Sequence, residues 1–396
     1  MLTAVIADDL TGAADTGVQF ARAGYRSAVV FRGEPVPAEG LDAVVFDTDS
    51  RTRRPGLAAR YVAEAGRNVR GARIVYKKFD STLRGPVAAE LSAAFESTRR
   101  RRAVVAPALP AAGRTTVGGT QLVHGVPVHE TEMRNDPRTP VTNGHVPTLL
   151  GRWSSSVGTL SVDDLEDPEK VRHALARDEW TVVDAQRDAD LVALVRAVPD
   201  PGAVLWAGSA GLALALGAVY PGPAEAGASF ARARSVLVVV GSLNAASRGQ
   251  LDRSVEGYGD VAVPVGPGSA GTVGEVVAKA RGILSGGSCA VVHSSGRASS
   301  SARGQVMRAL AGAAAALSGE DLFDGLVLTG GSTAVAVSRA LGASGIRLAG
   351  ELEAGVPVGT LIGPRPYAVV TKAGGFGRPD TLVGAVESLL KGDGET

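Results

Sequence analysis

The sequence predicts an α/β protein of two domains, each a mainly parallel β-sheet flanked by helices. Its 396 residues exceed the length that one hydrophobic core usually serves. Short apolar runs with strand character alternate with helix-like segments, which is typical of parallel sheets covered by helices. The alternation stops at a Pro-, Gly- and Ala-rich stretch and then restarts. We therefore expect one domain over residues 1–220, a linker over 221–234 and a second domain over 235–396.

Strands are expected where apolar runs end in Gly, Ser, Thr or Asp. In the first domain these runs cover residues 2–7, 27–31, 43–46, 73–77, 103–106, 158–162, 181–183 and 204–207. In the second domain they cover residues 236–240, 260–265, 288–293, 325–329 and 368–371, with helices at 274–284 and 301–317 among others. Residues 105–141 are rich in proline and lack periodicity, so we expect a long irregular excursion that contributes to function.

The charge balance and cysteine content exclude several classes of partner. With 41 basic and 40 acidic residues the net charge is +1, so no overall field attracts nucleic acid or an anionic membrane. A small-molecule ligand fits better. The single cysteine, Cys289, excludes an internal disulfide, and the five histidines show no metal-ligand spacing. Because no apolar run is long enough for a membrane span, we expect a cytoplasmic protein; its oligomeric state stays open, a homodimer included.

The segment IADDLTGAADTG places two carboxylates at the end of the first strand. The apolar run ends at Ala7, so Asp8 and Asp9 follow at the carboxyl edge of the sheet, where parallel sheets hold ligands. Thr11 is expected to cap the following helix, and Gly12 lets a ligand approach the backbone. Adjacent carboxylates can orient a substrate hydroxyl, accept its proton or hold the water shell of a metal ion. The alternative is that one of them only caps the helix.

The segment YKKFDSTLRG repeats this arrangement with mixed charges. The expected strand ends at Lys77, and the turn that follows carries both signs of charge. Lys78 and Arg84 can clamp a carboxylate, while Asp80 and Ser81 can hydrogen-bond hydroxyl groups. This set of side chains suits a polyhydroxy acid. The alternative is a structural ion pair between Arg84 and Asp80.

Lysine usage also indicates anion binding. Only six of the 41 basic residues are lysines, and three of the six, Lys77, Lys78 and Lys372, lie inside the motifs. A flexible ammonium with three donors is the usual cation for a mobile phosphate oxygen, whereas Arg suits a fixed planar carboxylate. The alternative is that these are ordinary surface lysines.

The second domain carries glycine-rich turns that can hold phosphate. In LVLTGGSTA and TKAGGFG an apolar strand leads into a Gly-Gly turn and then a helix, and VVVGSLNAASRGQ offers a third strand-loop-helix turn. Free backbone amides at a helix N-terminus form an anion site. The candidate residues in these turns are Ser242, Gly330, Gly331, Ser332, Thr333, Lys372 and Gly374.

One further segment, GPGSAG at residues 266–271, fits the dinucleotide pattern G-x-G-x-x-G. It lacks the acidic residue expected about 20 positions later, and Pro267 interrupts the turn. No P-loop pattern G-x-x-x-x-G-K-[ST] occurs in the chain. The segment is therefore the weaker candidate for a nucleotide site.

Taken in order, these motifs resemble the four-carbon acid sugar kinase family, which phosphorylates threonate, erythronate or 3-oxo-tetronate with ATP. The resemblance spans nearly the whole chain and includes PALPAAGRTTVGG and HETEMRNDPRTPV. It implies an N-terminal acid-sugar domain and a C-terminal nucleotide domain that closes over it, with the active site in the cleft between them. The nucleotide residues that it implies are Ser242, Gly330, Gly331, Ser332, Thr333 and Gly374.

The resulting hypothesis is transfer of the ATP γ-phosphoryl group, with Mg²⁺, to the terminal hydroxyl of a four-carbon acid sugar. Asp8 or Asp9 would orient or deprotonate the hydroxyl, and Lys78 and Arg84 would hold the carboxylate. The metal ligands stay unknown, since Mg²⁺ often binds through phosphates and water. The alternatives are an NAD(P)-dependent oxidoreductase that uses GPGSAG and a non-catalytic acid-sugar sensor. The sequence selects neither the tetronate nor its stereoisomer.

Overall fold

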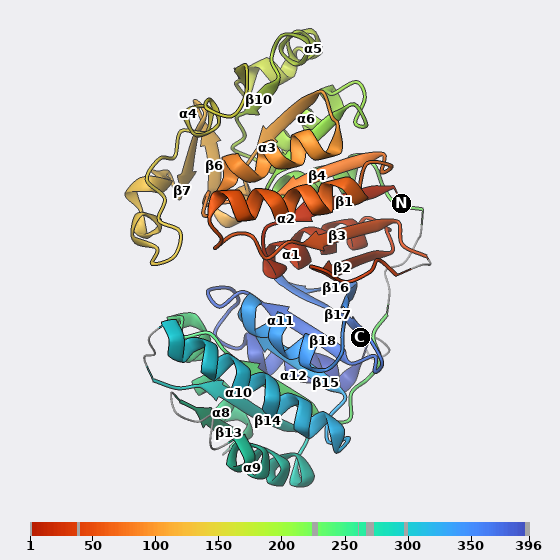
Figure 1. The fold of residues 1–396 in the computed structure, drawn as a ribbon, viewed down its shortest axis with the longest axis vertical. Helices are drawn as coiled ribbons and strands as arrows, with labels where there is room; N and C mark the ends of the chain where they lie inside the picture. Colours follow the sequence, from red (N-terminus) through yellow and green to blue (C-terminus); the bar gives the residue numbers. More distant parts are fainter. Residues whose placement is uncertain are drawn as a thin grey trace. The chain divides into compact units, whose positions relative to one another are not determined.

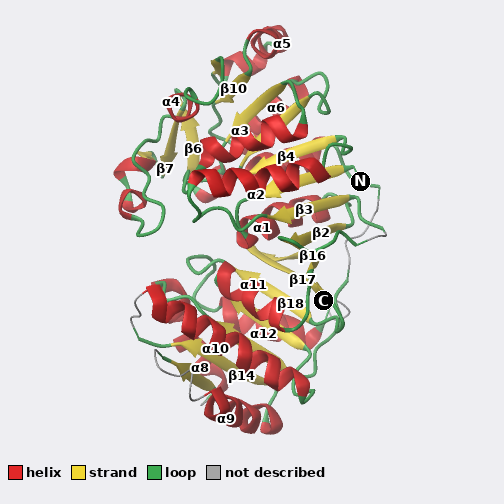
Figure 2. Cartoon of the chain, viewed as in Figure 1, coloured by secondary structure: helices red, strands yellow, loops and turns green. Residues whose placement is uncertain are grey.

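A computed structural model describes residues 2–37, 40–223, 229–259, 261–266, 273–296 and 300–392 (Figure 1). The chain divides near residue 226 into two compact units. Each unit contains mainly parallel strands and its own cluster of buried apolar side chains. In Figure 2 the strands of both units alternate with helices that cover them. The predicted α/β class, with mainly parallel strands flanked by helices in both units, is therefore confirmed.

The first unit contains a sheet in which every pair of neighbouring strands is parallel. Its strands lie in the order β2-β3-β1-β4-β11-β5-β10-β9. Their bounds are β1 Thr3–Ala7, β2 Ser27–Phe31, β3 Ala43–Asp47, β4 Ile74–Lys78, β5 Arg102–Ala106, β9 Val157–Leu160, β10 Trp180–Val183 and β11 Val204–Gly208. Because β3, β1 and β4 are neighbours, the residues that follow them meet at one edge of the sheet.

Two groups of helices cover this sheet. One group packs α1 on α7 and α7 on α6, and the other packs α2 on α3. Gly66 in α2 allows the second contact, because a Cβ at that position would overlap the Ser97 hydroxyl of α3. The helices are α1 Leu10–Arg22, α2 Pro55–Asn68, α3 Val87–Thr98, α4 Val146–Leu150, α5 Pro168–Arg177, α6 Asp188–Ala197 and α7 Ala210–Val219.

The excursion over residues 105–141 is more regular than its sequence predicts. It contains a small antiparallel sheet of β6 Arg114–Val117, β7 Thr120–Val123 and β8 Val126–Pro127, with short 3₁₀ helices beside it. Gly118 and Gly119 join β6 to β7 with φ of 57° and 72°, the left-handed backbone that a tight hairpin turn requires. Both amides donate to Asp184 at the end of β10, at 2.6 and 2.8 Å. The hairpin is thereby fixed to the large sheet.

The second unit contains a parallel sheet extended by an antiparallel hairpin. Its strands lie in the order β13-β14-β12-β15-β18-β17-β16, and only the pairs that involve β17 are antiparallel. Helices α9, α10 and α11 pack in one group, and α8 packs on α12. The strands are β12 Val236–Val240, β13 Ala262–Val265, β14 Cys289–Ser294, β15 Gly325–Thr329, β16 Gly345–Glu353, β17 Val356–Ile362 and β18 Ala368–Lys372. The helices are α8 Ala245–Tyr258, α9 Val273–Gly286, α10 Ser300–Gly319, α11 Gly331–Ala340 and α12 Thr381–Lys391.

The β16–β17 hairpin is an element that the sequence pattern did not predict. The pairing of β16 with β17 shifts register between Leu348 and Gly350 and again between Glu351 and Glu353. Such bulges break the two-residue alternation by which a half-buried strand is recognised in a sequence. The predicted strands elsewhere agree with the structure to within one or two residues, apart from residue 260, which lies outside the described residues.

Candidate functional site

Three neighbouring strands of the first unit bring the predicted polar residues together. In the register of the sheet, Ala7 at the end of β1 pairs with Asp47 of β3 and with Lys78 of β4. Asp8 and Asp9 follow Ala7 directly, so the two motifs found in the sequence meet at this edge. We call the group of Asp8, Asp9, Arg51, Lys78 and Asp80 the amino-terminal site.

Asp8 is buried and held by Arg51, a residue that the sequence reasoning missed. The Arg51 guanidinium donates from Nε to Asp8 Oδ2 at 2.7 Å and from Nη2 to Asp8 Oδ1 at 3.0 Å. Burial acts to raise the pKa of Asp8, but the charges of Arg51, Lys78 and Lys77 outweigh it and hold the pKa below its usual value. Asp8 is therefore an ionised carboxylate with both oxygens engaged.

Asp9 is the more accessible member of the pair. Its side chain is 24% exposed, compared with 2% for Asp8. It accepts from Arg51 Nη1 at 2.6 Å, from the Gly12 amide at 2.8 Å and from the Thr11 hydroxyl at 2.8 Å. Asp9, and not Thr11 as expected, is thus the N-cap of α1. The capping role proposed as an alternative is real, and it leaves the Asp9 carboxylate at the surface of the site.

The segment Asp47–Arg51 also contributes to the site, because it lies at the carboxyl end of a parallel strand, as the two predicted motifs do. It begins at the last residue of β3, and the amides of Ser50 and Arg51 donate to the Asp8 carbonyl at 2.9 and 3.1 Å. Polar residues after the apolar strand were the available signal, since DTDSR succeeds AVVF as DDLT succeeds AVIA. The Asp47 carboxyl is buried, and burial together with the charges of Asp9, Asp49 and Asp8 raises its pKa to about 7. A carboxyl with a raised pKa therefore lies near the Asp8 carboxylate, whose pKa is lowered.

Asp80 and Arg84 form the ion pair that was the alternative reading of their motif. Arg84 donates from Nε and Nη2 to the two Asp80 oxygens at 2.8 and 3.0 Å. Arg51 Nη1 is also 3.8 Å from Asp80, which connects this pair to Asp8 and Asp9. Arg84 Nη1 lies 3.7 Å from Asp136 of the excursion. Two of the three Arg84 guanidinium nitrogens are thus engaged by Asp80.

Ser81 is covered by the hairpin of the excursion. Arg114 of β6 donates to the Ser81 hydroxyl at 3.1 Å, and Gln121 of β7 donates to the Ser81 carbonyl at 2.8 Å. The excursion therefore borders the predicted substrate residues, and Arg114 and Gln121 are further members of this surface. Their distance along the chain from Ser81 hid this contact from the sequence reasoning.

Lys78 is buried next to the start of helix α1. It is 4% exposed, and a Cβ built on Gly12 would lie 2.7 Å from its Nζ. The ammonium thus lies beside the first turn of a 13-residue helix. A cation beside a helix N-terminus is a strong anion site, because the amides and the helix dipole act with the charge. Lys77 and Lys372 are buried too, so the alternative that these are ordinary surface lysines is wrong for all three.

The second unit places its predicted turns at the ends of three neighbouring strands, β12, β15 and β18. Gly330 caps helix α11 with φ of 95°, and its amide donates to the Lys372 carbonyl at 2.9 Å. A Cβ at Gly374 would overlap the Ser242 hydroxyl, so the turns after β12 and β18 touch. We call the group of Ser242, Gly330, Thr333, Lys372 and Gly374 the carboxyl-terminal site.

The other predicted members of these turns occupy different surroundings. Gly331 is the first residue of α11, so its amide belongs to the free N-terminal turn. Ser332 is exposed, while Thr333 is 7% exposed and packs against Gly241. Of the predicted residues in this turn, Thr333 is therefore buried and Ser332 is exposed.

Lys372 is the most distinctive residue of the carboxyl-terminal site. It is 1% exposed, and within the described part of the chain its Nζ has no hydrogen-bond partner. Burial lowers its pKa to about 8, with little compensation from Glu353. The hydroxyl of Thr329, opposite Lys372 in the sheet register, is likewise buried and without a partner among the described residues. Unsatisfied buried polar groups are costly, so this arrangement indicates a ligand that supplies the missing acceptor.

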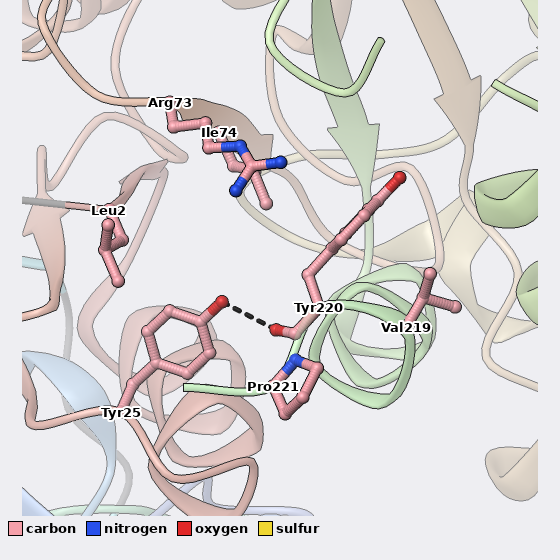
Figure 3. A pocket seen from close by; sticks show the side chains of 7 residues that line it. All are labelled: Leu2, Tyr25, Arg73, Ile74, Val219, Tyr220 and Pro221. Carbon is pink, nitrogen blue, oxygen red and sulfur yellow. Dashed lines mark hydrogen bonds between the residues drawn. The ribbon is translucent and has the colours of Figure 1, made fainter. Parts of the chain in front are cut away.

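Two further features carry no candidate site. In the dinucleotide-like segment GPGSAG, residues 267–271 lie outside the described residues. A cavity of about 230 Å³ lies in the first unit, at the amino-terminal ends of β1 and β4. Figure 3 shows the side chains that line it. Its charged lining residue, Arg73, is exposed, and the Tyr25 hydroxyl already donates to the Tyr220 carbonyl at 2.6 Å. This edge is opposite the one that collects the polar motifs.

The comparison with protein families decides the family. Residues 3–216 match the model of a sugar-binding N-terminal domain, and residues 237–382 match that of a nucleotide-binding C-terminal domain. A D-threonate kinase of Salmonella typhimurium is 35% identical over 98% of this chain and 99% of its own. The chain belongs to the four-carbon acid sugar kinase family. This acid sugar kinase is accordingly a phosphotransferase that acts on an alcohol group.

Other relatives agree with this assignment. A D-erythronate kinase of Heliobacterium modesticaldum is 33% identical to this acid sugar kinase, over 98% of this chain and 96% of its own. A solved structure from Salmonella typhimurium LT2 has the same fold, with a TM-score of 0.82 and 23% identity over 97% of this chain and 98% of its own. None of the described helices is both long and apolar enough to cross a membrane.

Proposed function

We propose that this kinase transfers the γ-phosphoryl group of ATP to the terminal hydroxyl of threonate, erythronate or 3-oxo-tetronate. The observation that carries the proposal is the buried Lys372 ammonium, which has no hydrogen-bond acceptor among the described residues and belongs to the strand whose last carbonyl accepts from Gly330, the N-cap of α11. A polyphosphate would supply that acceptor, and ATP is the donor that a kinase requires. The substrate class rests on the relatives named D-threonate kinase and D-erythronate kinase.

In the amino-terminal site, the sugar carboxylate is proposed to bind Lys78 and the first amides of α1. Arg84 contributes its remaining nitrogen, Nη1, because Asp80 already occupies Nε and Nη2. Ser81 and Asp80 would hydrogen-bond the sugar hydroxyls. Together these groups offer fixed cations at one end and acceptors at the other, which suits a short polyhydroxy acid.

Asp9 is the proposed partner of the reacting hydroxyl. Asp8 has both oxygens bound by Arg51 and is almost fully buried, so its role is to hold Arg51. Asp9 is more exposed and can accept a hydrogen bond from the sugar. In the reaction the hydroxyl oxygen bonds to the γ-phosphorus, the bond from that phosphorus to the bridging oxygen breaks, and ADP leaves. The hydroxyl proton passes to Asp9 and then to water.

The carboxyl-terminal site is proposed to hold the ATP phosphates. Lys372 would neutralise their charge, while the amides after Gly330 and the close approach allowed by Gly374 would bind oxygens through the backbone. The described residues contain no group of three His, Cys, Asp or Glu side chains that fits a metal ion. We therefore assign Mg²⁺ no protein ligand; it is expected to enter as the complex with ATP.

The deciding experiment measures ADP release from ATP and Mg²⁺ across both enantiomers of threonate and erythronate and across 3-oxo-tetronate. Mass spectrometry should show the added phosphoryl group, and NMR should place it on the terminal oxygen. Asp9→Asn serves as the control for enzyme-dependent turnover. If no member of the panel raises ADP release above the rate without sugar, and none binds, the proposed substrate class is wrong.

A further inference from the structure

Beneath the amino-terminal site lies a buried ion pair that none of the proposed contacts uses. Lys77 Nζ is 2.8 Å from Glu90 Oε2, with side chains 0% and 1% exposed. Burying two charges usually costs about as much as their attraction returns. Within the described residues the second Glu90 oxygen, Oε1, has no hydrogen-bond partner, so the pair is incompletely satisfied. Folding stability alone is a poor reason for such a pair.

Lys77 lies at the carboxyl end of β4, next to the residues of the amino-terminal site. Lys77 precedes Lys78 on β4, and its ammonium donates to the Lys78 carbonyl at 2.6 Å. It pairs in register with Ile6 of β1, two residues before Asp8. Its charge is one of those that keep the Asp8 carboxylate ionised. Lys77 thus contacts the backbone of Lys78 in the second motif and influences the charge of Asp8 in the first.

The Glu90 end of the pair supports the segment that presents Arg51. Burial raises the pKa of the Glu90 carboxyl, and the Ser50 hydroxyl that hydrogen-bonds it acts in the opposite direction. The same hydroxyl is 2.7 Å from Thr48 Oγ1, which donates to the Ala7 carbonyl at 2.6 Å. The Ser50 amide donates to the Asp8 carbonyl. Glu90 is therefore the first member of a series of polar contacts that runs through Ser50 to the backbone of Ala7 and Asp8 at the end of β1.

The turn that leads into helix α3, whose first turn carries Glu90, packs against Arg51. Gly85, two residues before the helix, has φ of 95°, and a Cβ there would lie 3.0 Å from the Arg51 carbonyl and 3.2 Å from its Cγ. The helix start and the Arg51 backbone are thus in direct contact. A shift of α3 relative to β4 would be transmitted to the guanidinium that binds Asp8 and Asp9.

We propose that Lys77 and Glu90 are positioning residues, which fix Arg51 against Asp8 and Asp9 for turnover instead of stabilising the fold. The inference rests on the proposed kinase function. It assigns the pair to geometry because both side chains are buried and none of the contacts proposed for the substrates involves them. Since a displaced Arg51 would misplace Asp9 in the transition state more than it would weaken substrate capture, the pair should affect kcat and not KM.

The test replaces the pair as a unit. Lys77→Met combined with Glu90→Leu removes both charges and keeps apolar volume, a change that proteins often tolerate without loss of stability. We expect parental urea midpoint, KM for ATP and acid sugar within about twofold, and kcat lowered about 10- to 100-fold. The variant Glu90→Gln keeps an oxygen acceptor for Lys77, so its kcat should lie between that of the double variant and that of the parent. The matched control is Arg26→Met with Asp42→Leu, an ion pair at the opposite edge of the same sheet, which should leave kcat unchanged.

Two results would overturn the proposal. One is a folded double variant with parental kcat. The other is a double variant whose lost activity simply follows a lost folded fraction, because the pair would then be structural. If the parent enzyme phosphorylates no acid sugar, the proposed function fails instead. The positional claim would then be judged by a crystal structure of the double variant, in which Arg51 should leave the bidentate position on Asp8.

Discussion

Replacing Lys372 by Met should make the protein more stable and a worse ATP enzyme. Burial lowers the pKa of Lys372 from 10.5 to about 8, so keeping it charged at pH 7 costs about 3 kcal/mol, at 1.36 kcal/mol per unit. Met has a similar shape and no charge. Its side chain should therefore raise the free energy of unfolding by up to about 3 kcal/mol at pH 7.

The sign of the pH dependence follows from the direction of this pKa shift. Between pH 8 and 10.5 the unfolded chain binds a proton at Lys372 that the folded protein has released, so the parent gains stability as pH rises. The advantage of the Met variant should therefore shrink, from about 3 kcal/mol at pH 7 to about 1 kcal/mol at pH 9.5. Urea unfolding at the two pH values measures it.

The same substitution should weaken ATP binding. A hydrogen bond to a charged group contributes about 1.5–3 kcal/mol, so KM for ATP should rise about 10- to 150-fold. Lys279→Met, on the exposed side of α9, is the matched control and should change neither property. A Lys372→Met protein that is less stable than the parent at pH 7, or whose advantage is the same at pH 9.5, would refute the reasoning. The ammonium would then have a partner in the free protein.

Three further outcomes test individual residues. Because the folded protein keeps the Asp47 proton up to about pH 7 and the unfolded chain releases it near 3.8, Asp47→Asn should be about 4 kcal/mol more stable than the parent at pH 8.5. At pH 4 the two should agree to within about 1 kcal/mol, by urea titration. Lys78→Met should weaken acid-sugar binding about 10- to 150-fold in calorimetry with ATP affinity within twofold, and the reverse pattern would exchange the roles of the two sites. Gly374→Ala should raise KM for ATP at least about fivefold, because its Cβ would overlap the Ser242 hydroxyl, whereas Gly384→Ala, where a Cβ meets open space, should not; equal KM values would show that phosphate does not approach that backbone.

The ends of the strands could be predicted because the signal is local. An apolar run followed by Gly, Ser, Thr or Asp marks where a parallel strand stops, and ligands gather at that edge whatever the strand order. Asp8, Asp9 and Lys78 were found in this way, and so were the turns at Gly330 and Gly374. Their linked order along the chain also indicated the family before any comparison.

Side-chain contacts between neighbouring strands could not be predicted in this way. Arg51 binds Asp8 from 43 residues away, and only the adjacency of β1 and β3 makes the contact possible. The Asp80–Arg84 ion pair was one of two alternatives that the sequence allowed. Whether Asp80 binds two of the Arg84 nitrogens depends on side-chain geometry, which the sequence does not give. The excursion was predicted irregular, since its hairpin rests on the Gly118–Gly119 turn and on Asp184 from another strand.

The sequence by itself determined which elements form and which residues end them, since backbone preference and apolar periodicity act over a few neighbouring residues. Only the tertiary structure decided which charges are satisfied. Lys77 and Lys372 are both buried lysines at strand ends, yet one is paired with Glu90 and the other has no partner in the described residues. That difference comes from what each strand packs against, because the free energy of a buried charge depends on the groups a few ångströms away in space and not along the chain.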